Sequence, residues 1–222
     1  MPNWLSRRRA EPVELDVLAA YAQWAAGYSP DAHNPLMQLE EQAVLGLLPE
    51  LDGRRFLDLA CGSGRYLKRL APDGGGRAIG VDFSRQMLAR AASLGQPLAQ
   101  ADLLALPLAG GAFDLIVCGL AVGHIADLAA SVAEMGRVLD SGGVLIYSDF
   151  HPFGALLGWK RTFRAADGNE YAARHHVHLY AAHQAACQAA GLHIDAVREP
   201  RIEGEHPYRG YPAVLVIRAG KP

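Results

Sequence analysis

The sequence predicts an α/β fold in which helices cover both faces of a mostly parallel sheet. Short apolar runs, such as 113–119 and 143–149, alternate with segments of helical pattern between residues 55 and 149. Strands that are buried on both faces have this continuous apolar pattern. A turn of small residues, 60–64, follows the first run. Half of the 222 residues are hydrophobic, which suits one domain with its own core.

The N-terminal segment, 13–48, has a helical pattern that breaks near residues 29–35. Tyr21, Trp24 and Tyr28 recur at helical spacing, so we expect them to share one helix face. Pro30 and Pro35 interrupt the pattern and predict a loop. A second amphipathic helix is expected over 36–48.

The central segment alternates between strand and helix. Ser84 is a suitable N-cap for one of these helices. Ligands of open parallel sheets bind at the carboxyl ends of the strands, and Asp58, Asp82, Asp102 and Cys118 fall at or just past such ends. The expected strands are 56–60, 78–82, 98–102, 113–119 and 143–149, and the expected helices are 65–70, 84–94 and 127–139.

The pattern changes after residue 149. Residues 151–154 are predicted to form a loop, and the turn at 166–169 predicts a hairpin with arms at 161–164 and 170–177. A helix over 180–190 should end at Gly191, before two closing strands at 194–198 and 213–218. In a strand, His176 and His178 would share one face, but no nearby carboxylate or cysteine completes a metal site. No metal is therefore expected.

The glycine turn is compatible with two classes of ligand. A nicotinamide dinucleotide needs a third glycine where this chain has Leu67, and Asp58 would repel its pyrophosphate. A row of three carboxylates instead suits a ligand with a cationic end, a ribose and an adenine. The residues therefore favour the second class.

The motifs at 57–66, 80–83, 101–103, 113–117 and 141–146 resemble those of the class I S-adenosylmethionine (SAM)-dependent methyltransferases. The similarity covers about residues 54–149 and is of the small-molecule type, as in the ubiquinone and biotin pathways. It implies a Rossmann-like three-layer sandwich, with a seven-stranded, mostly parallel sheet whose last strand is antiparallel. It also implies a single domain, with an N-terminal lid at 13–48 and a cap insertion at 151–178.

The resemblance implies a set of cofactor contacts. Asp58, Ala60, Gly62 and Gly64 match the first motif, around the methionine part of SAM, although the family often has glycine where this chain has Ala60. Asp82 matches the acidic residue that accepts hydrogen bonds from the ribose hydroxyls.

Further residues of this set follow the later strands. Phe83 and Met87 would border the adenine, Asp102 would accept from its amino group, and Leu103 would donate a backbone N–H to the ring. Cys118, at the end of the fourth strand, is placed in the same set.

The aromatic N-terminal segment resembles one that closes over the cofactor in many small-molecule members. Tyr21 and Tyr28 are therefore expected to contact the cofactor, while Trp24 is expected in the core. Packing of the whole aromatic face on the sheet is the alternative.

Histidines supply the candidate catalytic and substrate-binding residues. His124 follows the fourth strand, where similar enzymes have a pair, His-His or His-Trp. It is expected to line the substrate pocket, and a general base or a structural role remains open. His151 is a second candidate for both roles, and His176 is expected to line the pocket. Lys160, Arg161 and Arg164 could attract an anionic substrate, but a solvated hairpin face is the favoured interpretation.

The expected activity is methyl transfer from SAM to an oxygen, nitrogen or carbon nucleophile of a small molecule, with S-adenosylhomocysteine as product. The net charge of −2 argues against a nucleic-acid partner. The alternatives are a methyltransferase of RNA or protein, another reaction on a SAM-type cofactor, and a non-catalytic SAM-binding protein.

Features outside the motifs predict the location of the chain. The three cysteines form no disulfide framework, and acidic residues rather than an apolar run follow Arg7–Arg9. No apolar run reaches the length of a membrane span. A cytoplasmic protein without a membrane partner, monomeric or homodimeric, is expected.

Overall fold

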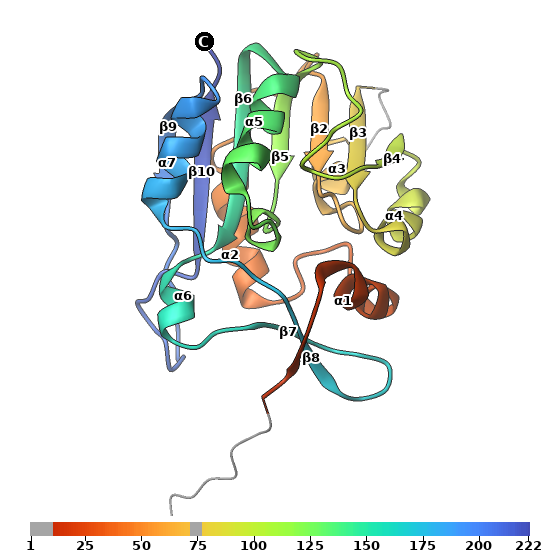
Figure 1. Ribbon diagram of the computed structural model, residues 1–222, viewed down its shortest axis with the longest axis vertical. Helices are drawn as coiled ribbons and strands as arrows, with labels where there is room; N and C mark the ends of the chain where they lie inside the picture. The colour runs from red at the N-terminus through yellow and green to blue at the C-terminus, as the bar shows by residue number, and fades with distance from the viewer. Residues whose placement is uncertain (1–10, 72–76) are drawn as a thin grey trace, which may run out of the picture.

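The computed structural model describes residues 11–71 and 77–222, so Arg7–Arg9 lie outside the described residues. Its middle layer is a seven-stranded sheet in the order β4-β3-β2-β5-β6-β10-β9 (Figure 1). Neighbouring strands are parallel except β10, which is antiparallel to both β6 and β9. The predicted fold class is confirmed. The strands are β2 (Phe56–Leu59), β3 (Ala78–Asp82), β4 (Leu98–Gln100), β5 (Phe113–Cys118), β6 (Leu139–Phe150), β9 (His193–Arg198) and β10 (Val214–Gly220).

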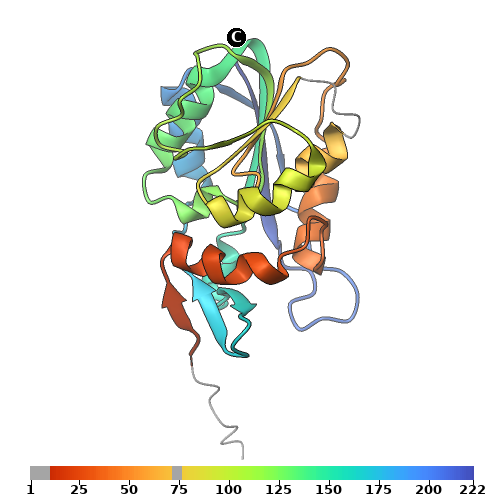
Figure 2. The ribbon, with the colours of Figure 1, turned by 90° about the vertical axis from the view of Figure 1, so that its right-hand side faces the viewer.

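Helices cover both faces of this sheet, as the edge-on view in Figure 2 shows. α5 (Leu128–Val138) and α7 (Tyr180–Ala189) pack on one face, and α2 (Pro35–Leu45) and α3 (Arg65–Leu70) on the other. α4 (Arg85–Ala91) follows β3 and packs beside β3 and β4. Because the central strands have apolar neighbours on both sides, their sequences are apolar without alternation.

Local sequence signals set most helix ends. Ser84 caps α4 by accepting a hydrogen bond from the Met87 N–H at 3.3 Å, as predicted. Asn34 caps α2 in the same way, with Pro35 at the first helical position. Gly191, in the left-handed region at φ +71°, follows the end of α7.

A second, three-stranded sheet lies below the carboxyl edge of the main sheet, in the order β1-β8-β7 (Figure 1). Its strands are β1 (Val13–Leu15), β7 (Arg161–Arg164) and β8 (Glu170–Ala173). The prediction of helix from residue 13 is wrong, because Val13–Leu15 pairs with β8 before α1 (Val17–Trp24) begins. Tyr28 also lies outside α1, after a 3₁₀ turn at Ala25–Gly27.

Two further predictions around the hairpin need correction. Residues 153–156 form a short helix, α6 (Phe153–Leu156), where a loop was expected. β8 ends at Ala173, opposite the first residue of β7, so residues 174–178 have no strand partner there. His176 and His178 therefore do not share a strand face, and the His176 N–H instead donates to the Gly123 carbonyl at 2.6 Å. In the described parts of the chain, no helix has the length and apolar character needed to cross a membrane.

Candidate active site

A cavity of about 1290 Å³ lies at the carboxyl edge of the main sheet, between the strand ends, α1 and the β7–β8 hairpin. Pockets for a single small ligand usually measure ~300–1,000 Å³, so this cavity has room for a cofactor and an acceptor together. Most of the residues predicted to bind ligand line it: Tyr21, Tyr28, Asp58, Ala60, Gly62, Asp82, Phe83, Met87, Asp102, Leu103, His124 and His176.

The turn between β2 and α3 forms one wall of the cavity. Ala60, Gly62 and Gly64 all have positive φ, of 54°, 55° and 87°. A Cβ at Gly62 would have only the Met87 Cε near it, at 4.0 Å, whereas a Cβ at Gly64 would collide with Leu94. Gly64 is not among the cavity-lining residues and is required for packing, whereas Gly62 leaves the backbone open to a ligand.

Asp82 ties this turn to the end of β3. Its Oδ2 accepts from the Gly62 N–H at 2.7 Å and its Oδ1 from the Ser84 N–H at 2.8 Å. Burial raises the pKa of this carboxyl, against the effect of those backbone donors. Each oxygen keeps a lone pair, so Asp82 can accept two further hydrogen bonds from a ligand in the cavity.

Asp58 and Asp102 complete the acidic row. Asp58 is 1% exposed and accepts from the Leu67 N–H at 3.0 Å; burial raises its pKa to about 7. Asp102 accepts from the Leu104 N–H at 2.9 Å. Phe83, 46% exposed, and the buried Met87 lie beside the row. These residues fit SAM, because the carboxylates suit its positive charge and ribose hydroxyls, and the apolar side chains suit its adenine.

Cys118 does not join this set. It is fully buried in the core between the sheet and α5, and it is not among the residues that line the cavity. Its strand ends at the correct edge, but the pleat turns this side chain toward the helices. The expectation of a cofactor contact from Cys118 is therefore wrong for its side chain.

Aromatic rings from α1 and the following turn form the floor of the cavity. Trp24 stacks on Tyr21 at 5.6 Å between ring centroids, and on Phe163 of β7 at 5.0 Å. Tyr28 packs edge-on against Trp24 at 4.9 Å. Trp24 both lines the cavity and joins α1 to the hairpin.

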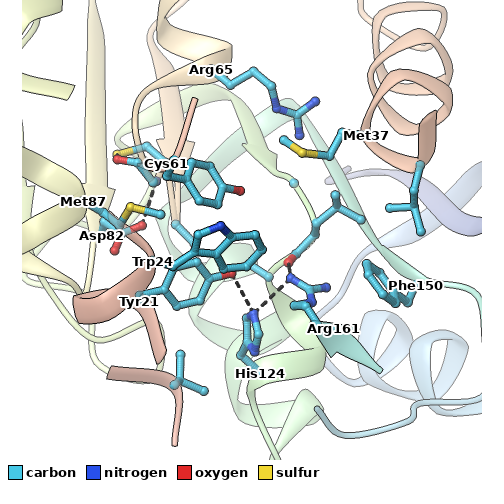
Figure 3. A pocket seen from close by; sticks show the side chains of 18 of the residues that line it. Tyr21, Trp24, Met37, Cys61, Arg65, Asp82, Met87, His124, Phe150 and Arg161 are labelled. Carbon is cyan, nitrogen blue, oxygen red and sulfur yellow. Dashed lines mark hydrogen bonds between the residues drawn. The ribbon is translucent and has the colours of Figure 1, made fainter. Parts of the chain in front are cut away.

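His124 lies at the centre of a hydrogen-bonded cluster (Figure 3). Its Nδ1 is 3.0 Å from the Arg174 carbonyl oxygen, which can only accept, so Nδ1 carries the proton. Its Nε2 then carries a lone pair that can accept hydrogen bonds. This atom lies 3.0 Å from both the Tyr21 hydroxyl oxygen and Arg161 Nη1. Burial and the charge of Arg161 lower the pKa of His124 to about 3.

The packing around Gly123 explains why this chain has only His124 where similar enzymes have a pair, His-His or His-Trp. A Cβ at residue 123 would collide with the Asp149 carboxylate and with the His175 ring. His175 Nε2 is 3.2 Å from Asp149 Oδ1, so the 174–178 segment occupies the space that a side chain at 123 would need. His178 bonds to the Ile125 carbonyl at 2.8 Å and anchors the same segment.

His151 lies away from the large cavity. It lines a separate cavity of about 110 Å³ and bonds through Nε2 to Glu199 at 3.1 Å. Its Nδ1 accepts from the Phe153 N–H at 3.2 Å, so both ring nitrogens have partners outside the large cavity, and its expected place at the substrate mouth is wrong. Within the described ranges, no three His, Cys, Asp or Glu side chains form a group that could hold a metal ion.

Arg161 lines the cavity, whereas the sequence interpretation favoured a solvated hairpin face for it over contact with an anionic substrate. It is 6% exposed and lines the cavity, whereas Arg164 on the same strand is exposed. Arg161 and Phe163 are two residues apart, so they share the inward face of β7. That alternation was the available signal, and the expectation of a solvated Arg161 is wrong.

Comparison with known proteins gives consistent results. Residues 57–147 match the family described as "Methyltransferase domain". The chain is 34% identical over 160 residues to a malonyl-[acyl-carrier protein] O-methyltransferase of Enterobacter lignolyticus, covering 71% of this chain and 62% of that protein. It is 38% identical over 108 residues to a demethylmenaquinone methyltransferase of Thermus thermophilus, covering 45% and 48%. The chain thus spans less than two thirds of the length of these relatives.

A solved structure shares the fold over a larger part of the chain. The SAM-dependent methyltransferase from Mesorhizobium loti is 25% identical in sequence and aligns with a TM-score of 0.67. The alignment covers 82% of this chain and 97% of that one. The shared region therefore extends beyond residues 57–147.

Proposed function

The chain carries a methyltransferase domain with the class I SAM-dependent fold, and we propose that it transfers a methyl group from SAM to a small-molecule acceptor. The observation that carries the proposal is Asp82, whose two oxygens each hold a backbone N–H and still face the cavity. A dinucleotide would place its pyrophosphate against the Asp58 carboxylate inside the turn, which disfavours it.

We assign the ends of the cavity accordingly. Asp58, Ala60 and Gly62 would surround the methionine part of SAM, and Asp82 would accept from its ribose hydroxyls. Asp102, with the Leu103 backbone, Phe83 and Met87, would hold the adenine. His124 and His176 lie further along the cavity and would contact the acceptor.

SAM supplies a methyl group that is already activated on a positively charged sulfur. The protein then has to align the acceptor with that methyl group and exclude water. Orientation of this kind can lower a barrier by ~7–11 kcal/mol in favourable cases. α1, with Tyr21 and Tyr28, and the segment 151–178 would form the lid and the cap that enclose the two ligands.

The identity of the acceptor does not follow from the relatives. One is named for a malonyl group on a carrier protein and another for demethylmenaquinone, yet both resemble this chain at 34% and 38% identity. Both names describe methyl transfer. We therefore propose methyl transfer to a small acceptor and name no particular acceptor.

Calorimetric titration with SAM and S-adenosylhomocysteine, with NAD as a control ligand, tests the proposal. We expect micromolar binding of both adenosyl ligands and at least tenfold weaker binding to Asp82→Asn, which keeps the shape of the side chain but loses its charge. Asp195→Asn, on the edge strand β9, is the matched control and should bind like the wild type. Binding of NAD in place of SAM would refute the proposal, as would equal SAM affinity in Asp82→Asn.

A further inference from the structure

Charged side chains of different sign line different parts of the large cavity. Asp58, Asp82 and Asp102 line the end near the glycine turn, together with Arg65, which is paired with Glu40 and Glu41. Lys160, Arg161 and Arg174 line the end formed by the hairpin. Lys160 and Arg174 are exposed and pair with Glu11 and Glu14 on their outer sides. Arg161 is the cation that the fold buries at this end.

The hydrogen bonds of Arg161 are incomplete. Its Nη1 donates to the Leu120 carbonyl and to His124 Nε2, and its Nη2 lies 3.1 Å from Asp149 Oδ1. The Phe150 ring lies beneath the guanidinium, 4.4 Å from its central carbon (Figure 3). Its Nε–H is buried and has no hydrogen-bond partner among residues 11–71 and 77–222. Leaving a buried donor unpaired costs ~1–3 kcal/mol, and more when the group is charged.

Trp159, two residues before Arg161, also has a buried N–H group that is unpaired among the described residues. Trp159 lines the same cavity, and its indole Nε1–H is buried without a partner in the described part of the chain. Gly154 packs against the ring, since a Cβ there would come within 2.7 Å of Trp159 Cε3. Trp159 and Arg161, two positions apart in the sequence, thus each have a buried N–H group that can only donate. A ligand that complements them must bring an acceptor atom.

The neighbouring groups are poorly suited to removing a proton from such a ligand. The lone pair of His124 Nε2 already faces two donors, the Tyr21 hydroxyl and Arg161, and arginine cannot give up its proton. Asp149 is held by Arg161 and by His175. An acceptor whose oxygen is ionised before it binds would need none of these groups as a base.

We propose that Arg161, assisted by the Trp159 indole N–H, binds an anionic oxygen of the methyl acceptor. The inference rests on the proposed methyl transfer and specifies its substrate class: a small molecule with a carboxylate or an acidic enol or phenol, ionised at neutral pH. His124 is a positioning residue, which holds the guanidinium in place by accepting from Nη1. Where the bound oxygen is itself the nucleophile, its lone pair forms the bond to the methyl carbon. The carbon–sulfur electron pair goes to sulfur, and no proton moves.

The test uses the protein saturated with S-adenosylhomocysteine and titrated with matched probes. Benzoate and benzamide differ in charge but little in shape, and 4-nitrophenolate and 4-nitroanisole form a second pair. We expect at least one anion to bind tenfold or more tightly than its neutral partner. The pair that shows the difference distinguishes a carboxylate from an acidic phenol or enol.

Three variants test which residues cause the tighter binding of the anion. Arg161→Gln, or Arg161→Gln with Asp149→Asn if the single variant does not fold, should lose the preference for the anion. Trp159→Phe keeps the ring, removes one donor and should weaken anion binding severalfold. Arg164→Gln, on the exposed face of the same strand, is the control and should match the wild type.

The outcomes separate this inference from the proposed function. Equal binding of anions and neutral partners, no binding of any anion, or an unchanged preference in the Arg161 variants would overturn the role of Arg161. In those cases S-adenosylhomocysteine would still bind. Loss of S-adenosylhomocysteine binding in the wild type would instead refute the proposed cofactor.

Discussion

At the scale of single residues, Asp58 has the most informative acid–base behaviour in the acidic row. Burial raises its pKa to about 7, even though the Leu67 N–H stabilises the ionised form. In the ligand-free protein the folded state therefore holds a proton more tightly than the unfolded chain does. The resulting stabilisation is complete below about pH 4 and is lost as the pH rises through about 7.

Binding of the positively charged SAM should favour the ionised form of Asp58 over the protonated form. We expect the affinity for SAM to fall as the pH decreases from 7 to 5.5, by up to tenfold per pH unit, because the positive ligand favours ionised Asp58. Calorimetry at four pH values measures the slope. Asp58→Asn should bind more weakly at pH 7 and show a flatter profile. An equal slope in the variant would assign the effect to another group.

Ala60 and Leu120 show strain at the same edge of the sheet. Both have positive φ, 54° and 55°, without being glycine, and both line the cavity at the ends of adjacent strands. Such a conformation costs ~1–2 kcal/mol for a residue with a Cβ. At Leu120 it directs the carbonyl oxygen to Arg161, so local strain is used to position a cavity side chain.

At the scale of elements, Trp24 connects α1 to the hairpin. Its ring is stacked between Tyr21 and Phe163, and aromatic pairs of this kind contribute ~0.5–1.5 kcal/mol each. A small cluster of buried residues, separate from the core of the main sheet, lies at the same junction around Ala20 and Phe163. Trp24 therefore stabilises the covering of the cavity rather than the main sheet.

Trp24→Ala should loosen this covering selectively. We expect faster hydrogen exchange in α1, β7 and β8, corresponding to a loss of about 1.5–4.5 kcal/mol for the three aromatic pairs of Trp24, and unchanged protection in β5 and β6. Hydrogen exchange followed by mass spectrometry resolves these segments. Leu156→Ala, at a site 81% exposed, is the control. Uniform loss of protection would instead show that α1 and the hairpin unfold together with the sheet.

At the scale of the whole molecule, the buried Glu40 of α2 links distant parts of the chain. Its carboxylate accepts from Arg65 at 2.7 Å, Tyr66 at 2.9 Å and Ser148 at 2.6 Å. Ser148 in turn accepts from the Leu120 N–H at 2.9 Å. The path connects α2 and α3 with the ends of β5 and β6, and through Leu120 with Arg161.

Breaking this network should affect the global stability. We expect Glu40→Gln to lower the free energy of unfolding by about 3–5 kcal/mol, because it removes the close partner of buried Arg65. Urea unfolding measures the change, and Glu50→Gln, at an exposed site after α2, is the control. A change below about 1 kcal/mol would mean that Glu41, 3.5 Å from Arg65, replaces Glu40.

The sequence by itself determined the main sheet and the cofactor end of the cavity. β3 and α3 have the predicted bounds, and most other central elements differ by a few residues at their ends. The physical reason is local: strand periodicity, Ser84 as a cap and the small residues at 60–64 act within a few residues of chain. Because parallel strands end at one edge, the same information brought Asp58, Asp82 and Asp102 together.

Only the tertiary structure decided the acceptor end. Val13–Leu15 is a strand because β8 lies beside it, and His151 lies outside the large cavity, where it contacts Glu199 and the Phe153 N–H. Arg161 is buried because Asp149, His124 and the Leu120 carbonyl meet it from separate elements. These contacts join residues that are 12 to about 160 positions apart, so no local pattern specifies them, and they decide which groups line the hairpin end of the cavity.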